Sequence, residues 1–120
     1  MLELITKLPV NVIGVKASGQ VTANDYQTVL IPIIEARLKL HPKIRILFHL
    51  GTDFTDFSLG AMWTDAKIGV DHFKAWEMIA IVTDEAWVTS ASDIFNFAIP
   101  CPLLVFSNDQ YTEAEIWLTT

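Results

Sequence analysis

A strand-helix-strand pattern around residues 51–84 constrains the fold of this chain more than any other feature of its sequence. Residues 43–50 alternate between apolar and more polar positions and residues 78–82 are uniformly apolar, so both runs are predicted strands. Between them, residues 58–73 carry a stripe of apolar side chains at helical spacing, formed by Leu59, Met62, Trp63, Ala66, Val70 and Phe73. Such a unit predicts two parallel strands joined by a right-handed helical crossover.

An opening hairpin is predicted before this unit. Residues 2–6 and 11–18 are short strand-like runs, and the Leu8-Pro9 step between them favours a turn. Gly19 is expected to end the second run. The pattern therefore predicts two neighbouring antiparallel strands.

The first predicted helix follows this hairpin. Thr22 and Asp25 have the spacing of a capping box, in which each side chain accepts a hydrogen bond from the other residue's backbone amide. Apolar residues then recur at helical spacing as far as the His41-Pro42 step, where the helix is expected to stop. Because proline has no backbone N–H to donate, Pro32 is expected to bend or weaken the middle of this helix.

The remaining elements complete a single α/β domain. We predict a helix over residues 84–98 with Asp84 as its cap, a strand over Leu103–Phe106 and a helix over Tyr111–Leu118. The predicted order is ββαβαβαβα, which implies a mixed, mainly parallel five-stranded sheet with about four helices. A chain of 120 residues is long enough to bury one core, and no repeat or linker divides it.

Charge and hydropathy exclude several classes of partner. The net charge is −6 and the eight Lys and Arg residues are scattered, so the basic patch that nucleic acid or an anionic membrane requires is not expected. The longest uncharged stretch, residues 94–108, is interrupted by Pro100 and Pro102, which argues against stable membrane insertion. No signal peptide is recognised and Cys101 is the single cysteine, so we predict a cytoplasmic protein without an intrachain disulfide.

No residue pattern predicts a reaction. The glycines are isolated and do not form a phosphate-binding loop. The histidines, at positions 41, 49 and 72, lack the spacing of metal ligands, and Cys101 between two prolines is expected to be a buried structural thiol. We therefore predict a non-enzymatic protein with no catalytic residues, no metal and no cofactor.

Acidic residues follow three of the predicted strands. Asp53 and Asp56 come after the third strand, Asp84 after the fourth and Asp109 after the fifth. The carboxyl ends of parallel strands meet at one edge of a sheet, where α/β domains bind ligands. These aspartates are therefore candidates for a polar ligand site, and the alternative is that each one caps the start of a helix.

Aromatic residues are concentrated in the middle of the chain. Hydrophobic residues make up 52% of the sequence, so we expect either an exposed apolar patch used for self-association or a lined cavity. Phe54 and Phe57 belong to a predicted turn and Phe97 departs from the inward stripe of its predicted helix. The candidate interface or pocket residues are Phe54, Phe57, Trp63, Trp87, Phe95 and Phe97.

The order and spacing of several motifs resemble the SpoIIAA-like group of STAS domains. The likeness rests on Gly19, the Thr22–Tyr26 segment, and the sequences LGAMWTDAKIG, WEMIAIVTDEAW and EAEIWL, and it covers nearly the whole chain. The resemblance implies a fold shared with anti-anti-sigma factors and, more loosely, with Sec14-like lipid-binding domains.

The resemblance also draws attention to Ser58. In the anti-anti-sigma branch, a serine in an Asp-Ser-Ser-Gly-like turn opens the second helix and is phosphorylated to switch partner binding. Here Asp56-Phe57-Ser58-Leu59-Gly60 occupies that turn, and it departs from the pattern because Phe57 replaces the first serine and Leu59 separates Ser58 from Gly60. Ser58 is therefore the candidate switch residue, and an ordinary helix cap is the alternative.

Two functions from different classes are compatible with the sequence. The first is a protein-interaction or regulatory domain that forms a homo-oligomer, expected to be a dimer, through apolar surface on its second and third helices. The second is a carrier of a small hydrophobic ligand or lipid, in which the aromatic helices line a pocket.

Overall fold

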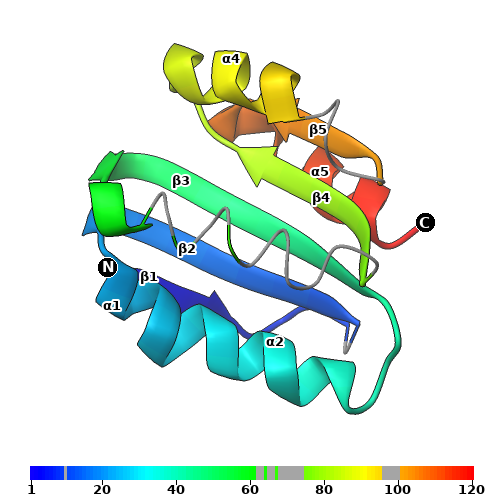
Figure 1. Cartoon of the computed structure of the whole chain (residues 1–120). Helices are drawn as coiled ribbons and strands as arrows, with labels where there is room; N and C mark the ends of the chain where they lie inside the picture. Colours follow the sequence, from blue (N-terminus) through cyan, green and yellow to red (C-terminus); the bar gives the residue numbers. More distant parts are fainter. Residues whose placement is uncertain (10, 62–63, 65–66, 68–74, 96–100) are drawn as a thin grey trace.

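A five-stranded sheet forms the centre of the molecule, shown in Figure 1 as a computed structural model that describes residues 1–9, 11–61, 64, 67, 75–95 and 101–120. The strands lie side by side in their order along the chain. β1 pairs antiparallel with β2, and the pairs β2–β3, β3–β4 and β4–β5 are parallel. The opening hairpin and the mixed, mainly parallel sheet are thereby confirmed. The strands are β1 Leu2–Ile5, β2 Val12–Val21, β3 Ile44–Phe57, β4 Trp76–Val82 and β5 Leu103–Phe106.

The helical segments follow the predicted order among the described residues. The predicted helix over residues 58–73 is described at residues 59–61, 64 and 67, which are helical, and its other positions after Ser58 lie outside the described residues. The remaining helical segments are α1 Ala23–Asp25, the π-helix η1 Tyr26–Leu30, α2 Ile31–Leu38, α4 Ala86–Phe95, the 3₁₀ turn η2 Asn108–Gln110 and α5 Tyr111–Leu118.

The first helical segment begins as its sequence predicts, and a π-helical turn directly precedes Pro32. The Thr22 backbone amide donates to Asp25 Oδ2 at 2.8 Å, and the Asp25 amide donates to Thr22 Oγ1 at 3.3 Å, which completes the capping box. Directly before Pro32, the Ile31 amide donates to the carbonyl of Tyr26, five residues back. A π-helical turn is wider than an α-helical one, so the chain accommodates the proline without ending the helix.

Each face of the sheet packs against different helices. One face buries Ile13, Val15, Ile46 and Phe48 of the central strands against α1–η1–α2, the helix that begins at Leu59, and α4. The opposite face buries a smaller cluster, in which Leu47, Ala80 and Val82 pack against α5. This second face also carries Lys16 and His49, because side chains alternate between the two faces along a strand.

The third strand is longer than its sequence predicts. The prediction ended this strand at Leu50 and placed residues 51–57 in a turn, but β3 continues to Phe57. β2 likewise continues past Gly19 to Val21, and Gln20 and Val21 lie opposite Asp56 and Phe57. The extra pairing with β2 provides hydrogen-bond partners for the backbone amide and carbonyl groups of this segment. The strand therefore continues although its sequence is polar.

Candidate functional site

Ser58 lies at the junction between β3 and the helix that begins at Leu59. Its backbone amide donates to the carbonyl of Val21 at 2.9 Å, which closes the pairing of β2 with β3. Its Oγ atom accepts a hydrogen bond from the Ala61 amide at 3.0 Å, and the residue is half-buried. Ser58 therefore caps the helix, as the alternative from sequence predicts.

Three of the candidate aromatic residues form one cluster beside Ser58. The ring centroids of Phe54 and Phe57 are 5.0 Å apart, and those of Phe57 and Trp87 are 6.1 Å apart in an edge-to-face arrangement. Phe54 also lies 6.3 Å from Trp87. Ring centroids at these separations make favourable aromatic contacts, so the end of β3 and the start of α4 pack through these three side chains.

The exposure of the aromatic cluster increases from Phe54 to Trp87. Phe54 is only 4% exposed and belongs to the core, so its prediction as an exposed turn residue is wrong; it lies in a strand and faces the helices. Phe57 is half-buried and Trp87 is 41% exposed. Leu59, the first helical residue after Ser58, is 86% exposed. We call Phe57, Leu59 and Trp87 the apolar patch.

The other candidate aromatic residues are Trp63, Phe95 and Phe97. Trp63 and Phe97 lie outside the described residues. Phe95 is the last residue of α4, and only this position is described. Phe54, Phe57 and Trp87 are therefore the candidate aromatic residues whose side-chain contacts the structure describes.

The four candidate aspartates do not form one site. Asp56 accepts from Thr55 Oγ1 at 3.1 Å and from Gln20 Nε2 at 3.4 Å, and Asp109 accepts from the hydroxyl of Ser107. Asp84 was expected to cap the helix that follows it, but Thr83 Oγ1 accepts from the Glu85 amide there instead. Asp53 and Asp56 lie within β3 and precede Ser58, which caps the next helix in their place.

Asp84 instead orients Asn108, which no sequence pattern marks as a candidate. Its two carboxylate oxygens accept from the Asn108 backbone amide at 2.9 Å and from Asn108 Nδ2 at 3.1 Å. The Asn108 side chain is thereby held in one orientation, because the amide nitrogen is the donor. Its Oδ1 atom is buried.

A polar pocket of about 310 Å³ lies at the carboxyl edge of the sheet, on the face covered by α5. Asp53 is the only candidate aspartate in its lining. The other residues that line it are Lys16 of β2, His49, Gly51 and Thr52 of β3, and Asn108 of η2. Lys16 and His49 lie opposite each other in the parallel pair, and each interrupts an otherwise mainly apolar strand. This interruption was the signal in the sequence that could have identified them.

His49 is half-buried in this pocket and its ring lies 4.9 Å from that of Tyr111, centroid to centroid. Burial is the largest effect on the pKa of His49 and lowers it below its ordinary value of 6.5, and the positive charge of Lys16 lowers this pKa further. The hydrogen bond with the Asn108 side chain and the negative charge of Asp53 both raise the pKa of His49. The net direction is downward, so the imidazole is mainly neutral at neutral pH. A neutral imidazole offers one hydrogen-bond donor and one acceptor.

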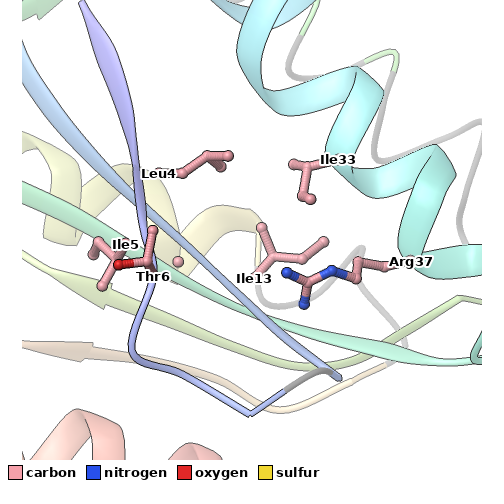
Figure 2. Close-up of a pocket in the computed structure, with 7 residues that line it drawn as sticks. Leu4, Ile5, Thr6, Ile13, Ile33 and Arg37 are labelled. Atoms are coloured by element: carbon pink, nitrogen blue, oxygen red, sulfur yellow. The ribbon is translucent and has the colours of Figure 1, made fainter.

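A second, smaller pocket lies between the hairpin and α2 (Figure 2). Leu4, Ile13 and Ile33 approach one another there, with the Arg37 side chain alongside. Its volume of about 140 Å³ is below the roughly 300 Å³ at which drug-sized ligand pockets begin. Among the described residues, no Phe or Trp side chain lines this pocket or the polar pocket.

The described residues contain neither a cluster of metal ligands nor a membrane-spanning helix. In that part of the chain, no three His, Cys, Asp or Glu side chains are grouped so that they could hold a metal ion. Within the same part, no helix is long and apolar enough to cross a membrane. The thiol of Cys101 is buried, as its sequence position predicts, and burial raises its pKa.

The open mixed sheet, the helix that begins at Leu59 and the order of the elements define a STAS-like α/β domain. The SpoIIAA-like family model matches residues 12–119, and the chain belongs to this family. It is also similar to the crystal structure of an uncharacterized protein of the DUF3478 family, with a SpoIIAA-like fold, from Shewanella loihica PV-4. That match has 26% sequence identity and a TM-score of 0.80, and it covers 98% of this chain and 93% of the other. No curated protein matches the chain.

Proposed function

We propose that this protein is a non-enzymatic, cytoplasmic interaction domain that forms a homodimer through the apolar patch of Phe57, Leu59 and Trp87. The single observation that carries this proposal is the exposure of two large apolar side chains, one at the start of the helix that begins at Leu59 and one at the start of α4. Leu59 is 86% exposed and Trp87 is 41% exposed, and Phe57 contacts Trp87. Aromatic residues that are partly exposed on a packed support are typical of the centre of an interface.

A second copy of the chain is the partner that best fits the patch. Phe57, Leu59 and Trp87 themselves carry no charge that would select a partner of opposite sign. A twofold interface requires only that a patch be complementary to itself, and a small apolar patch meets this requirement more easily than a charged one. The high apolar content of the sequence supports the same proposal.

Ser58 is the proposed regulatory residue of this interface. It lies between Phe57 and Leu59 in the sequence, and its hydroxyl already accepts a hydrogen bond from a helical amide. A phosphate at a helix start is stabilised by free amides and by the helix dipole, so its addition would leave the helix intact. The same phosphate would place about −2 charges within the apolar patch and would oppose dimer formation.

The test is the mass of the native protein measured by native mass spectrometry and by sedimentation velocity. We expect a dimer for the unmodified chain and a monomer for Leu59→Glu. A glutamate at the start of a helix is favourable for the helix, so loss of the dimer in this variant would not reflect a weakened helix. The proposal is abandoned if the unmodified protein remains a monomer at high concentration.

Ile116→Glu is the matched control for Leu59→Glu. Ile116 is 59% exposed and also lies on a helix, α5, which covers the opposite face of the sheet. The same change of chemistry at this position is expected to leave the dimer unchanged. If both variants become monomeric, the loss of association reflects added charge on the protein and not disruption of the apolar patch.

The hydrophobic-carrier alternative has no specific support in the described residues. Phe54, Phe57 and Trp87 pack against one another and do not surround a cavity that the structure shows. The mainly apolar pocket beside α2 is small. Organic extraction of the purified protein would release a bound amphiphile if this alternative held.

A further inference from the structure

β5 is the outermost strand on one side of the sheet, and among the described residues only one of its two edges pairs with another strand (Figure 1). On the paired edge, the carbonyls of Pro102 and Phe106 accept hydrogen bonds at 3.0 and 2.8 Å from amides of β4 and of the residue that follows it. Successive residues of a strand direct their backbone groups to opposite edges. The N–H and C=O groups of Leu103 and Val105 therefore point away from β4.

These four outward groups have no hydrogen-bond partner among the described residues. Native sheets protect a free edge with charged side chains, proline or bulges, or by keeping the edge strand short. The LLVF sequence of β5 is uncharged and contains no proline, and its register with β4 is uninterrupted, so its only protection is its length of four residues. The strand at the other edge, β1, carries the exposed charge of Glu3. The free edge of β5 is thus able to pair with a further short strand.

The side chains of β5 are apolar on both faces of the sheet. Leu104 lies beside Ala80 on the α5 face and is 44% exposed, although it is a large apolar side chain. Val105 lies on the other face and is half-buried. A strand added to β5 would place alternate side chains beside these two residues. Uncharged side chains fit there, because a charged one would lose water against Leu104 or Val105 without gaining a partner.

We propose that β5 binds an extended, uncharged segment of another protein, which joins the sheet as an additional strand. The amides of this segment donate to the carbonyls of Leu103 and Val105, and its carbonyls accept from their amides. The unpaired backbone groups determine this occupant, since an extended chain presents donors and acceptors at the spacing of a strand. A second copy of the chain fits less well, because a β5–β5 contact added to the proposed dimer would join copies into an open chain without a defined size.

The experiment is an NMR titration of the full chain with a short peptide of alternating threonine and valine with blocked ends, a composition that favours an extended conformation. Saturable shifts are expected at the amides of residues 103–106, together with slowed hydrogen exchange of the Leu103 and Val105 amides. The same peptide with every backbone nitrogen methylated cannot donate hydrogen bonds and is expected to bind at least about tenfold more weakly. The proposal is overturned if the first peptide gives no saturable shift in β5 or if both peptides bind equally well.

Val105→Pro tests which edge of β5 is used. Proline removes the outward N–H of residue 105, and edge strands tolerate proline where the N–H faces away from the sheet. The variant is expected to bind the unmethylated peptide at least about tenfold more weakly, and unchanged NMR signals outside β5 and its neighbours would show that it is folded. Unweakened binding by folded Val105→Pro would contradict the proposal. The methylated peptide gives an answer that does not depend on the folding of this variant.

Leu4→Pro is the matched control for Val105→Pro. The carbonyl of Met1 accepts from the Ser18 amide of β2 at 2.9 Å, so by the same alternation the N–H of Leu4 points away from β2. Leu4 is 46% exposed and lies at the other edge of the sheet. Peptide binding at residues 103–106 is expected to be unchanged in this variant, and equal weakening in both variants would count against a site on β5.

Two further measurements identify the occupant. Leu59→Glu is expected to bind the peptide as the unmodified chain does, because Leu59 does not belong to β5, so the proposed dimer and the β5 site can fail separately. Hydrogen exchange of the Leu103 and Val105 amides is then measured without peptide at increasing dilution. Protection that is present in the concentrated protein and lost on dilution would show that a second copy occupies the edge, which would overturn the proposal.

Discussion

Ser58 illustrates how one hydroxyl connects three parts of the molecule. Its backbone amide closes the β2–β3 pairing, its Oγ atom caps the next helix, and its two sequence neighbours belong to the apolar patch. Local stability and the proposed association therefore depend on the same residue. Substitutions that keep the cap and change the charge can separate these two contributions.

We expect Ser58→Ala and Ser58→Asp to have different effects. Alanine removes the acceptor for the Ala61 amide and should lower the free energy of unfolding by about 1 kcal/mol, measured by urea denaturation. Aspartate keeps an acceptor at the helix start and should preserve stability, but its charge should weaken the dimer by about tenfold. A Ser58→Asp variant that dimerises as tightly as the unmodified chain would contradict the proposed regulation.

His49 should make the stability of the protein depend on pH. Because burial lowers the pKa of His49 in the folded state below 6.5, the unfolded chain binds more protons in this range. The contribution of His49 to stability is therefore complete above about pH 6.5 and is lost as the pH falls from 6.5 through the lower pKa of the folded state.

The measurement is the midpoint of urea denaturation as a function of pH for the unmodified chain and for His49→Gln. The decline in stability on acidification from about pH 6.5 should be shallower in His49→Gln, since glutamine does not titrate. Parallel profiles for the two proteins would show that His49 does not cause the decline.

At the residue scale, sequence predicts a side chain's function best when its partners are local. The Thr22–Asp25 box and the Ser58 cap are visible in the sequence because their partners lie three residues away. Asp84 was assigned to the wrong partner because it contacts Asn108, 24 residues along the chain. Such a contact depends on where β4 and β5 end, and no local pattern contains that information.

At the scale of the elements, β2 and β3 show how a glycine permits a longer strand than its sequence predicts. Gly19 has a φ of +57°, and the register between β2 and β3 shifts on either side of it. The irregularity takes up a change in register that would otherwise end the pairing. Gly19 was expected to end the strand, and the structure shows that it instead allows β2 to continue to Val21.

Gly19→Ala should therefore destabilise the protein through the backbone alone. A side chain at this position would meet no atom within 4 Å, so no clash contributes. The left-handed conformation costs a residue with a Cβ atom about 1 to 2 kcal/mol, and we expect this decrease in the free energy of unfolding. Gly19→Asn should lose less, because asparagine tolerates the left-handed region. Equal stability of the three proteins in urea denaturation would refute this explanation.

At the scale of the whole molecule, hydrophobic periodicity was sufficient to predict the architecture. The alternation of apolar strands with helical stripes admits few arrangements, because parallel strands need right-handed crossovers. The polar pocket was not predicted, since Lys16, His49 and Asn108 come from three elements and share no sequence pattern. Only the pairing of β2 with β3 and the contact of Asn108 with Asp84 bring them together.

Net charge provides a whole-molecule test of the proposed dimer. Each chain carries a net charge of −6, so two copies repel each other while the apolar patch attracts them. Salt screens the repulsion between exposed charges, with a screening length of about 10 Å at 0.1 M, and does not weaken apolar contacts. Raising the salt concentration should therefore strengthen the dimer, whereas an interface held by ion pairs would weaken.

The measurement is the dissociation constant from sedimentation velocity at increasing sodium chloride concentration. We expect a dissociation constant that falls as salt is added, and a thermal midpoint that rises with protein concentration because association stabilises the folded chain. Leu59→Glu should lose both dependences, while Ile116→Glu should keep them. A dissociation constant that rises with salt would place the interface on charged surface and would exclude Phe57, Leu59 and Trp87 as its centre.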